Sequence, residues 1–333
     1  MGDTIGFGIL GLGMGAARAK TIANIEGARV AAVCDLDDER REKGVEEHEC
    51  LGFSNFEKML ECEEVDVAVV MTPSGTHAHF GKMAAAAGKH VITTKPMDLT
   101  VDRCNDLINT CAESGVRLVV DFESRYFPTM RQLKAAVDAG EFGDIIMGEA
   151  RCKWWRTQEY YESMGGWRGT WKLDGGGSLA NQSIHVIDML AWICGPPKSV
   201  TAKVGTFGHE IETEDLGMAM IEFETGAVGF VLGTTTFALN NQFGIEVHGN
   251  LGSASTVHNW REINVKFPDG RTELSAALPE GPPRNAAEDM VMSINSGQPP
   301  LVTGEEGRRA IELLEAIYQA AGVGDERRAA IDS

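Results

Sequence analysis

The sequence is poor in positive charge and has no long uncharged hydrophobic run. Its 333 residues include 30 lysines and arginines against 49 aspartates and glutamates, a formal net charge of −19. Such an acidic protein repels nucleic-acid phosphates and anionic lipids, so we expect neither nucleic acid nor membrane as a partner. No segment reaches the roughly 18 uncharged apolar residues that a membrane-spanning helix needs. The sequence therefore predicts a protein that works in solution.

Paired cysteines are also missing. The seven cysteines are odd in number and form no Cys-x-x-Cys motif, which argues against a disulfide framework and against a zinc site. One string has metal-ligand character, Glu47-His48-Glu49-Cys50, but its highly charged surroundings are typical of a solvated helix face, so we expect no metal. The start, Met1-Gly2-Asp3-Thr4, has no feature of a signal peptide. We expect an untargeted, cytoplasmic protein.

The pattern of the first third predicts a parallel sheet. Hydrophobic residues make up 43% of the chain and charged residues 24%, as in folded proteins, and the length suggests two domains. Short apolar runs occur at residues 5–10, 30–34, 65–70, 91–93 and 116–120. Helical patterns separate several of these runs, as in proteins whose parallel strands are joined by crossover helices. We expect residues 1–125 to form a doubly wound α/β domain.

After about residue 125 the runs become longer and alternate between apolar and polar residues. Strand patterns occur at residues 217–224, 227–234, 243–248 and 263–267. Thr225-Gly226 is a hairpin signal between two of them, and helical patterns occur at residues 183–194 and 305–321. We expect residues 126–333 to form an α+β domain with a large, mainly antiparallel open sheet. Its outer face would normally be buried against another copy, in a homodimer or homotetramer.

A glycine string, Gly11-x-Gly13-x-x-Ala16, follows the first predicted strand and opens a helix. Glycines there permit a tight turn and let main-chain amides approach a pyrophosphate, which the helix N-terminus stabilises. Asp35 ends the second predicted strand, where an acid accepts hydrogen bonds from an adenosine ribose. This acid favours NAD over NADP, although Arg40 and Arg41 keep NADP possible. A glycine-rich turn without a ligand is the alternative to this Rossmann-type cofactor site.

Five motifs together resemble those of the Gfo/Idh/MocA oxidoreductases. Besides the glycine string they are Met71-Thr72-Pro73 followed by His77, Thr94-Lys95-Pro96, the glycines at 175–177, and Asn181-x-x-x-His185. Their order and spacing resemble the family from Ile5 to the helix EAIYQAA near the C-terminus. The resemblance implies an NAD(P)-dependent enzyme acting on sugars, nucleotide sugars or cyclic polyols. Thr94 departs from the usual glutamate of the triplet, and Asn181 departs from the frequent aspartate.

The resemblance also implies the residues that contact the ligands. The expected cofactor contacts are Gly11, Gly13, Met14, Asp35, Thr72, Pro73, His77, Thr94, Lys95 and Arg168. The expected substrate contacts are Lys95, Arg125, Trp155, Arg156, Trp167, Asn181 and His185. Four of the six tryptophans lie between residues 154 and 171, and flat aromatic faces suit a sugar ring. Core packing or a subunit contact is the alternative for these tryptophans, and helix capping is the alternative for His77.

Lys95 and His185 are the expected catalytic pair, with Asn181 beside them. Lys95 follows a strand whose carboxyl end should face the ligand crevice, where its charge would stabilise a developing alkoxide. His185 shares a helical face with Asn181 and Asp188, and a neutral imidazole accepts a hydroxyl proton near neutral pH. Replacing aspartate with Asn181 puts a proton relay at that position in doubt. A surface lysine and a structural histidine are the alternatives.

The predicted function is an NAD-dependent oxidoreductase. It would transfer a hydride between nicotinamide and a hydroxyl-bearing carbon of a sugar, a sugar derivative or a cyclic polyol. One alternative is a glycoside hydrolase that acts by transient oxidation with tightly held NAD, and it would release sugar without accumulating reduced nicotinamide. Another is a nucleotide-sensing regulator without catalysis, against which the retention of Lys95 and His185 argues.

Overall fold

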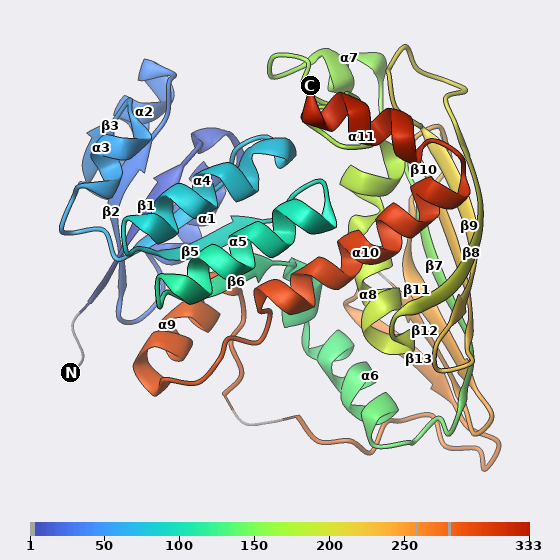
Figure 1. Cartoon of the computed structure of the whole chain (residues 1–333). Coiled ribbons are helices and arrows are strands. Elements are labelled where there is room, and N and C mark those ends of the chain that lie inside the picture. The colour runs from blue at the N-terminus through green and yellow to red at the C-terminus, as the bar shows by residue number, and fades with distance from the viewer. Residues whose placement is uncertain (1–3, 258, 279–280) are drawn as a thin grey trace. The chain divides into compact units, whose positions relative to one another are not determined.

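The computed structural model describes residues 4–257, 259–278 and 281–333, which belong to two compact units (Figure 1). The first unit is Met1–Phe122 with Pro283–Arg308, and the second is Glu123–Pro282 with Arg309–Ser333. The expected domain division after residue 125 stays a prediction, and the first unit differs from it by including a segment from late in the chain. The residues Met1 to Asp3, from which no targeting segment is expected, lie outside the described residues.

A six-stranded parallel sheet forms the first unit, in the order β3-β2-β1-β4-β5-β6. Its strands are β1 Ile5–Leu10, β2 Ala28–Cys34, β3 Leu51–Phe53, β4 Val67–Val70, β5 His90–Thr94 and β6 Leu118–Asp121. Its helices are α1 Leu12–Ile22, α2 Asp38–His48, α3 Phe56–Leu60, η1 Ser74–Thr76, α4 His77–Ala86, α5 Val101–Glu113 and α9 Ala286–Ser296. Strand order reverses between β1 and β4, which marks the place where such sheets bind ligands. The predicted Rossmann fold is confirmed.

Burial explains why these strands appear as continuous apolar runs. Every residue of β1, β4 and β6 is buried, because helices cover both faces of a doubly wound sheet. β3 is different, since its three residues are exposed or half-buried and the sequence pattern predicts no strand there. The charged string Glu47-His48-Glu49-Cys50 lies at the end of α2, where Glu47 pairs with Lys20 at 2.9 Å.

A seven-stranded sheet forms the second unit, in the order β13-β12-β11-β7-β10-β9-β8. Its strands are β7 Ile145–Lys153, β8 Pro197–Gly205, β9 Leu216–Phe223, β10 Val228–Thr234, β11 Gln242–Gly249, β12 Ser253–Val257 and β13 Glu262–Lys266. Only the β7–β10 pair is parallel among these described neighbours, so the expected mainly antiparallel sheet is confirmed. The helical segments of this part are η2 Glu123–Tyr126, α6 Pro128–Asp138, α7 Gln158–Glu162, the π-helix η3 Ser178–Gln182, α8 Ile184–Cys194, α10 Gly304–Ala320 and α11 Gly324–Asp332.

The two faces of this sheet differ, as β9 shows. The helix α8 packs against one face of the sheet (Figure 1). Gly217, Ala219, Ile221 and Phe223 are buried, whereas the residues that alternate with them are exposed or half-buried. Met218 and Met220 are exposed on the outer face, as is Val228 of β10, which lies opposite Glu222. Among the described helices, none is long and apolar enough to cross a membrane.

Candidate active site

The β1–α1 turn has the geometry of a dinucleotide site. Gly11 has φ 88°, in the left-handed region that favours glycine, and a Cβ there would lie 2.7 Å from the carbonyl oxygen of Met71. Only glycine fits this position, which brings the main chain of the turn close to the end of β4. Gly13 and Met14 follow in the first turn of α1, both exposed. The amides at this helix end are therefore accessible to a pyrophosphate.

Asp35 lies directly after β2, beside the same turn. Its carboxylate accepts a hydrogen bond from the main-chain N–H of Leu12 at 2.6 Å, and the carboxylate is half-buried. Arg41 donates to the main-chain carbonyl of Asp35 at 3.0 Å, and Arg40 lies 3.6 Å from Asp37. Both arginines are thus engaged by their own loop. The turn and the acid together fit the pyrophosphate and ribose of NAD.

His77 joins the ends of β4 and β5. Its Nδ1 lies 2.7 Å from the carbonyl oxygen of Pro96 and its Nε2 lies 2.8 Å from that of Thr72. The ring is 1% exposed, and burial lowers the pKa of His77, although both carbonyls oppose that shift. The N–H of Ala78 at the start of α4 is capped by Asp98 at 2.7 Å, so the ring of His77 is not the side-chain cap. His77 holds two loops together, and a cofactor contact through them stays a prediction.

The other expected residues of the first unit lie at these strand ends. Thr72 and Pro73 follow β4, and Thr94 and Lys95 lie at the end of β5. All four are half-buried, and the Lys95–Pro96 peptide bond is cis. Because β1, β4 and β5 are neighbours, their carboxyl ends form one edge beside Gly11. Lys95 therefore lies at the edge where a Rossmann-type sheet binds nicotinamide.

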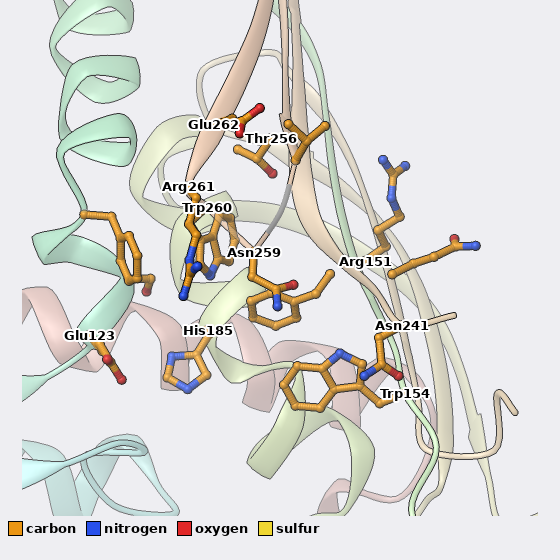
Figure 2. Close-up of a pocket in the computed structure, with 15 residues that line it drawn as sticks. Glu123, Arg151, Trp154, His185, Asn241, Thr256, Asn259, Trp260, Arg261 and Glu262 are labelled. Carbon is orange, nitrogen blue, oxygen red and sulfur yellow. The ribbon is translucent and has the colours of Figure 1, made fainter. Parts of the chain in front are cut away.

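The second unit contains a pocket of about 1140 Å³ that His185 of α8 helps to line (Figure 2). An aromatic cluster forms part of its wall. The rings of Trp154 and Phe243 stack with centroids 4.9 Å apart, and Trp260 meets Phe243 edge to face at 4.9 Å. The His185 ring lies 6.4 Å from that of Phe243. The expected base and a wall suited to a sugar ring therefore belong to one pocket.

Charged groups at the pocket differ in their pairing. Arg151 lies between Glu149 at 2.7 Å and Glu246 at 2.6 Å, so two acids already balance its charge. Arg261 is exposed and makes no ion pair with any residue that the structure describes. Arg261 is therefore the lining cation that is available to an anionic ligand, although Glu262 lies next to it in the chain.

Asn181 lies before α8, on the π-helix η3. The pattern predicts one helical face for Asn181 and His185, but α8 begins at Ile184 and the wider π turn precedes it. A single α-helical periodicity therefore does not relate the two residues. π turns are frequent at functional sites.

A buried carboxylate anchors the glycine-rich turn that precedes η3. Glu214 is 2% exposed and accepts hydrogen bonds from the N–H of Gly177 at 3.1 Å and from the hydroxyl of Tyr318 at 3.0 Å. Burial raises the pKa of Glu214, although these bonds oppose the shift. Arg327, from the C-terminal helix α11, donates to the carbonyl of Gly175 at 2.8 Å. A Cβ at Gly177 would lie 2.1 Å from the main-chain oxygen of Glu214, so the turn requires glycine.

Arg125 forms a buried ion pair with Asp188 of α8. Its guanidinium forms two hydrogen bonds of 2.7 Å with Asp188 and lies 4.2 Å from the ring centroid of Trp192. The exposed fractions of Arg125 and Asp188 are 1% and 0%. The cation of Arg125 is therefore buried against α8 and paired with Asp188, and a direct substrate contact by Arg125 stays a prediction.

Apart from Trp154, the arginines and tryptophans of residues 154–171 lie outside the lining of the His185 pocket, as far as the structure describes it. Trp155 is 49% exposed, and Arg156 packs over Trp154. Arg168 stacks between Trp167 and Tyr160 and lines a smaller pocket of about 460 Å³. Ligand contacts by Trp155, Arg156, Trp167 and Arg168 stay predictions.

Several pocket residues carry no motif. Asn241 lines the pocket directly before β11 and Phe243 lines it from β11, whereas Asn259, Trp260 and Arg261 lie just before β13. For the residues before β13, the sequence offers one indication of a ligand site. A tryptophan and an arginine, Trp260 and Arg261, are adjacent between two predicted strands.

Comparison with known proteins is consistent with this geometry. Residues 5–122 match the oxidoreductase family with an NAD-binding Rossmann fold, and residues 130–255 match the GFO/IDH/MocA C-terminal domain. The WlbA dehydrogenase from Bordetella pertussis, in complex with NADH and UDP-GlcNAcA, is 32% identical with a TM-score of 0.85, over 96% of this chain and 97% of that one. The aldose-aldose oxidoreductase from Caulobacter crescentus is 26% identical with a TM-score of 0.81, over 96% and 98%.

Among curated proteins, the inositol 2-dehydrogenase of Rhizobium meliloti is 23% identical over 98% of this chain and 99% of its own. These matches confirm the expected family, the expected cofactor NAD, and the expected class of oxidoreductase that acts on sugar or polyol hydroxyls. The chain belongs to the Gfo/Idh/MocA family of NAD-binding oxidoreductases.

Proposed function

We propose that this oxidoreductase oxidises a ring hydroxyl of a nucleotide-linked sugar. The size of the His185 pocket, about 1140 Å³, supports this proposal. Pockets for ordinary small ligands range over about 300–1,000 Å³, so this one has more room than a monosaccharide or an inositol needs. The similar WlbA dehydrogenase was crystallised with a nucleotide sugar, UDP-GlcNAcA.

The chemistry of the lining supports the same substrate class. The aromatic wall of Trp154, Phe243 and Trp260 offers ring faces for a sugar or a base. The amides of Asn241 and Asn259 provide donors and acceptors for hydroxyls (Figure 2). Arg261 provides a cation for a diphosphate or a uronate.

The reaction needs four things from the protein. His185 accepts the proton of the reacting hydroxyl, and Lys95 stabilises the negative charge that develops on its oxygen. The β1–α1 turn and Asp35 hold NAD, which when bound accepts the hydride. Asn181 orients the substrate from η3.

A substrate panel tests this function. Reduced nicotinamide would be followed with UDP-linked hexoses and hexuronates, the corresponding free sugars, myo-inositol and glycosides. We expect kcat/KM for a nucleotide sugar to exceed that for its free sugar about 10²-fold or more, because remote contacts contribute binding energy. Comparable turnover of free sugars or inositol would contradict the substrate class. Sugar release from glycosides without reduced nicotinamide would indicate a hydrolase.

Arg261 gives the panel a matched variant. Arg261→Ala should raise KM for the nucleotide sugar about tenfold and leave the KM of a free sugar nearly unchanged, because only the former carries the anionic group. Lys266→Ala removes an exposed cation of β13 that is not among the pocket-lining residues, and it serves as the control. Equal effects of Arg261→Ala on both substrates would assign the residue no role in substrate selection.

Asp35 should set the cofactor preference. We expect NAD to bind more tightly than NADP, because the carboxylate repels a 2′-phosphate. Asp35→Ser should narrow the difference by about 1 to 3 kcal/mol, measured as dissociation constants by fluorescence titration. Glu39→Ser removes an exposed acid of α2 and should change neither constant. Equal affinities in the unaltered protein would contradict the role of Asp35.

We also propose a homodimer or homotetramer that buries the outer face of the seven-stranded sheet. Met218, Met220 and Val228 are 41%, 59% and 50% exposed there, an apolar surface typical of subunit contacts. Met220→Glu should shift the mass in solution, measured by light scattering, towards the 35.9 kDa of one chain. Leu251→Glu, at another exposed apolar residue, should leave the mass unchanged. A single-chain mass for the unaltered protein would disprove the assembly.

A cytoplasmic location is part of the same proposal. All seven cysteines are free thiols, which suits a reducing compartment. Fractionation of the source cells tests it, and recovery outside the cytoplasm would contradict it.

A further inference from the structure

Asp174 is a buried carboxylate directly before the glycine-rich turn. It is 1% exposed. One carboxylate oxygen accepts the main-chain N–H of Gly169 at 2.9 Å, and the other accepts the side-chain amide of Asn181 at 2.6 Å. The buried carboxyl group of Asp174 therefore contacts Asn181, the residue that replaces the frequent aspartate of the family motif.

A chain of hydrogen bonds continues from Asn181. Its Oδ1 accepts from Nε2 of Gln182 at 2.9 Å, and Oε1 of Gln182 accepts from Arg156 at 2.7 Å. Nε2 of Gln182 also donates to the hydroxyl of Tyr160 at 2.7 Å. Arg156 in turn packs over Trp154, a wall residue of the His185 pocket. The chain thus links the buried acid to the pocket.

The two ends of this chain fix its direction. An arginine only donates hydrogen bonds, and an ionised carboxylate only accepts them. Each amide between them must therefore present its oxygen towards Arg156 and its nitrogen towards Asp174. Only an amide satisfies both neighbours at position 181. An ionised aspartate there would place acceptor against acceptor at 2.6 Å, next to the buried side chain of Asp174.

We propose that Asp174 and Asn181 are an interdependent pair, in which Asp174 is the positioning residue that holds η3 in register for His185. Asp174 supplies the carboxylate that position 181 lacks, and it acts through Asn181 without touching the substrate. Glu214 fixes the start of η3 through the N–H groups of Gly177 and Leu179, and Asp174 fixes the other end through the side chain of Asn181. The catalytic part of this inference rests on the proposed function.

An exchange of the two residues tests the pair. In Asp174→Asn, the new side chain has one acceptor oxygen for two donors, the N–H of Gly169 and the amide of Asn181. Its NH₂ group must face one of these donors, so kcat/KM should fall about tenfold or more. In Asn181→Asp, two carboxylates meet. In the double variant Asp174→Asn/Asn181→Asp, the oxygen of the residue at 174 accepts from Gly169 and its nitrogen donates to the new carboxylate, so each hydrogen bond named above is made again. The double variant should recover most of the loss of either single variant.

The pH profile separates positioning from packing. In Asn181→Asp the adjacent carboxylates share one proton at low pH, which maintains the contact. This proton is lost as pH rises through the raised pKa of the pair, so kcat/KM should fall about tenfold between about pH 6 and about pH 9 relative to the unaltered protein. The double variant should lack this fall. Among the described residues, the charged and titratable groups near the pair include Arg156, Tyr160, Tyr161, Glu214, Tyr318 and Arg327.

Melting temperature provides a readout that needs no substrate. The melting temperature of Asn181→Asp should fall as pH rises, relative to the unaltered protein, and that of the double variant should not. A flat profile for Asn181→Asp in both readouts, or a double variant no better than the worse single variant in melting temperature, would overturn the pairing. If the single variants do not fold, folding of the double variant supports the pairing and its failure overturns it. The pairing and the proposed function can fail separately. If the melting temperatures follow the expected pattern but the unaltered protein turns over no sugar substrate, the pairing is supported and the proposed function is wrong.

Discussion

Lys95→Ala and His185→Ala should each lower turnover about 10²-fold or more, while the affinity for NAD stays within a few-fold. Hydride leaves the carbinol carbon only as its hydroxyl loses a proton, so the reaction needs a base and a positive group at the same oxygen. His185 lines the large pocket of the second unit, and Lys95 lies at the end of β5 in the first. The pyrophosphate and the adenosine of NAD are expected to bind at Gly11 and Asp35, so removal of the Lys95 side chain alone should change the affinity for NAD little.

The double variant Lys95→Ala/His185→Ala should lose less than the product of the single losses, because groups that act as a unit are not additive. Single-turnover reduction of NAD measures the chemical step, and fluorescence titration measures cofactor affinity. Lys82→Ala and His248→Ala, each at a side chain 41% exposed, are the matched controls. Near-normal turnover in either active-site variant would make that residue structural and the proposed mechanism wrong.

The strands could be predicted where their burial produces a recognisable hydrophobic pattern in the sequence. β4 is buried at every position and appears as an apolar run, whereas β9 has one buried face and alternates. β3 has no such hydrophobic pattern, because its three residues are exposed or half-buried. Strand partners were also hidden, since nothing in the sequence indicates that β7 pairs in parallel with β10, about 80 positions later in the chain.

The candidate site was predictable where function depends on local backbone geometry. Gly11 and Asp35 follow strands, and their roles depend on the turn that they share. The pocket wall does not depend on one segment, because Trp154, Phe243 and Trp260 come from three separate parts of the chain. Asp174 shows the same limit. The family motif identifies its partner Asn181, but nothing in the sequence indicates that Asn181 donates a hydrogen bond to the carboxylate of Asp174.

Arg125 shows the same limit. The family resemblance implies a ligand contact at this residue, but nothing in the sequence indicates its partner Asp188, which is 63 residues away. Both side chains are almost completely buried, and the guanidinium is bound by two hydrogen bonds of 2.7 Å and covered by Trp192. Each of these buried charges loses its hydration on folding, and only the ion pair with the other charge compensates for that loss.

Asp188→Ala should therefore destabilise the second unit by about 3 to 5 kcal/mol, because it leaves the buried guanidinium of Arg125 without its counter-charge. Arg125→Met/Asp188→Leu should recover most of that loss, since apolar side chains of similar volume remove both charges together. All six tryptophans belong to the second unit, so urea unfolding followed by tryptophan fluorescence reports on it directly. Lys58→Ala breaks an exposed pair in the first unit and should leave that transition unchanged. If Asp188→Ala unfolds at the same urea concentration as the unaltered protein, the pair does not stabilise the second unit.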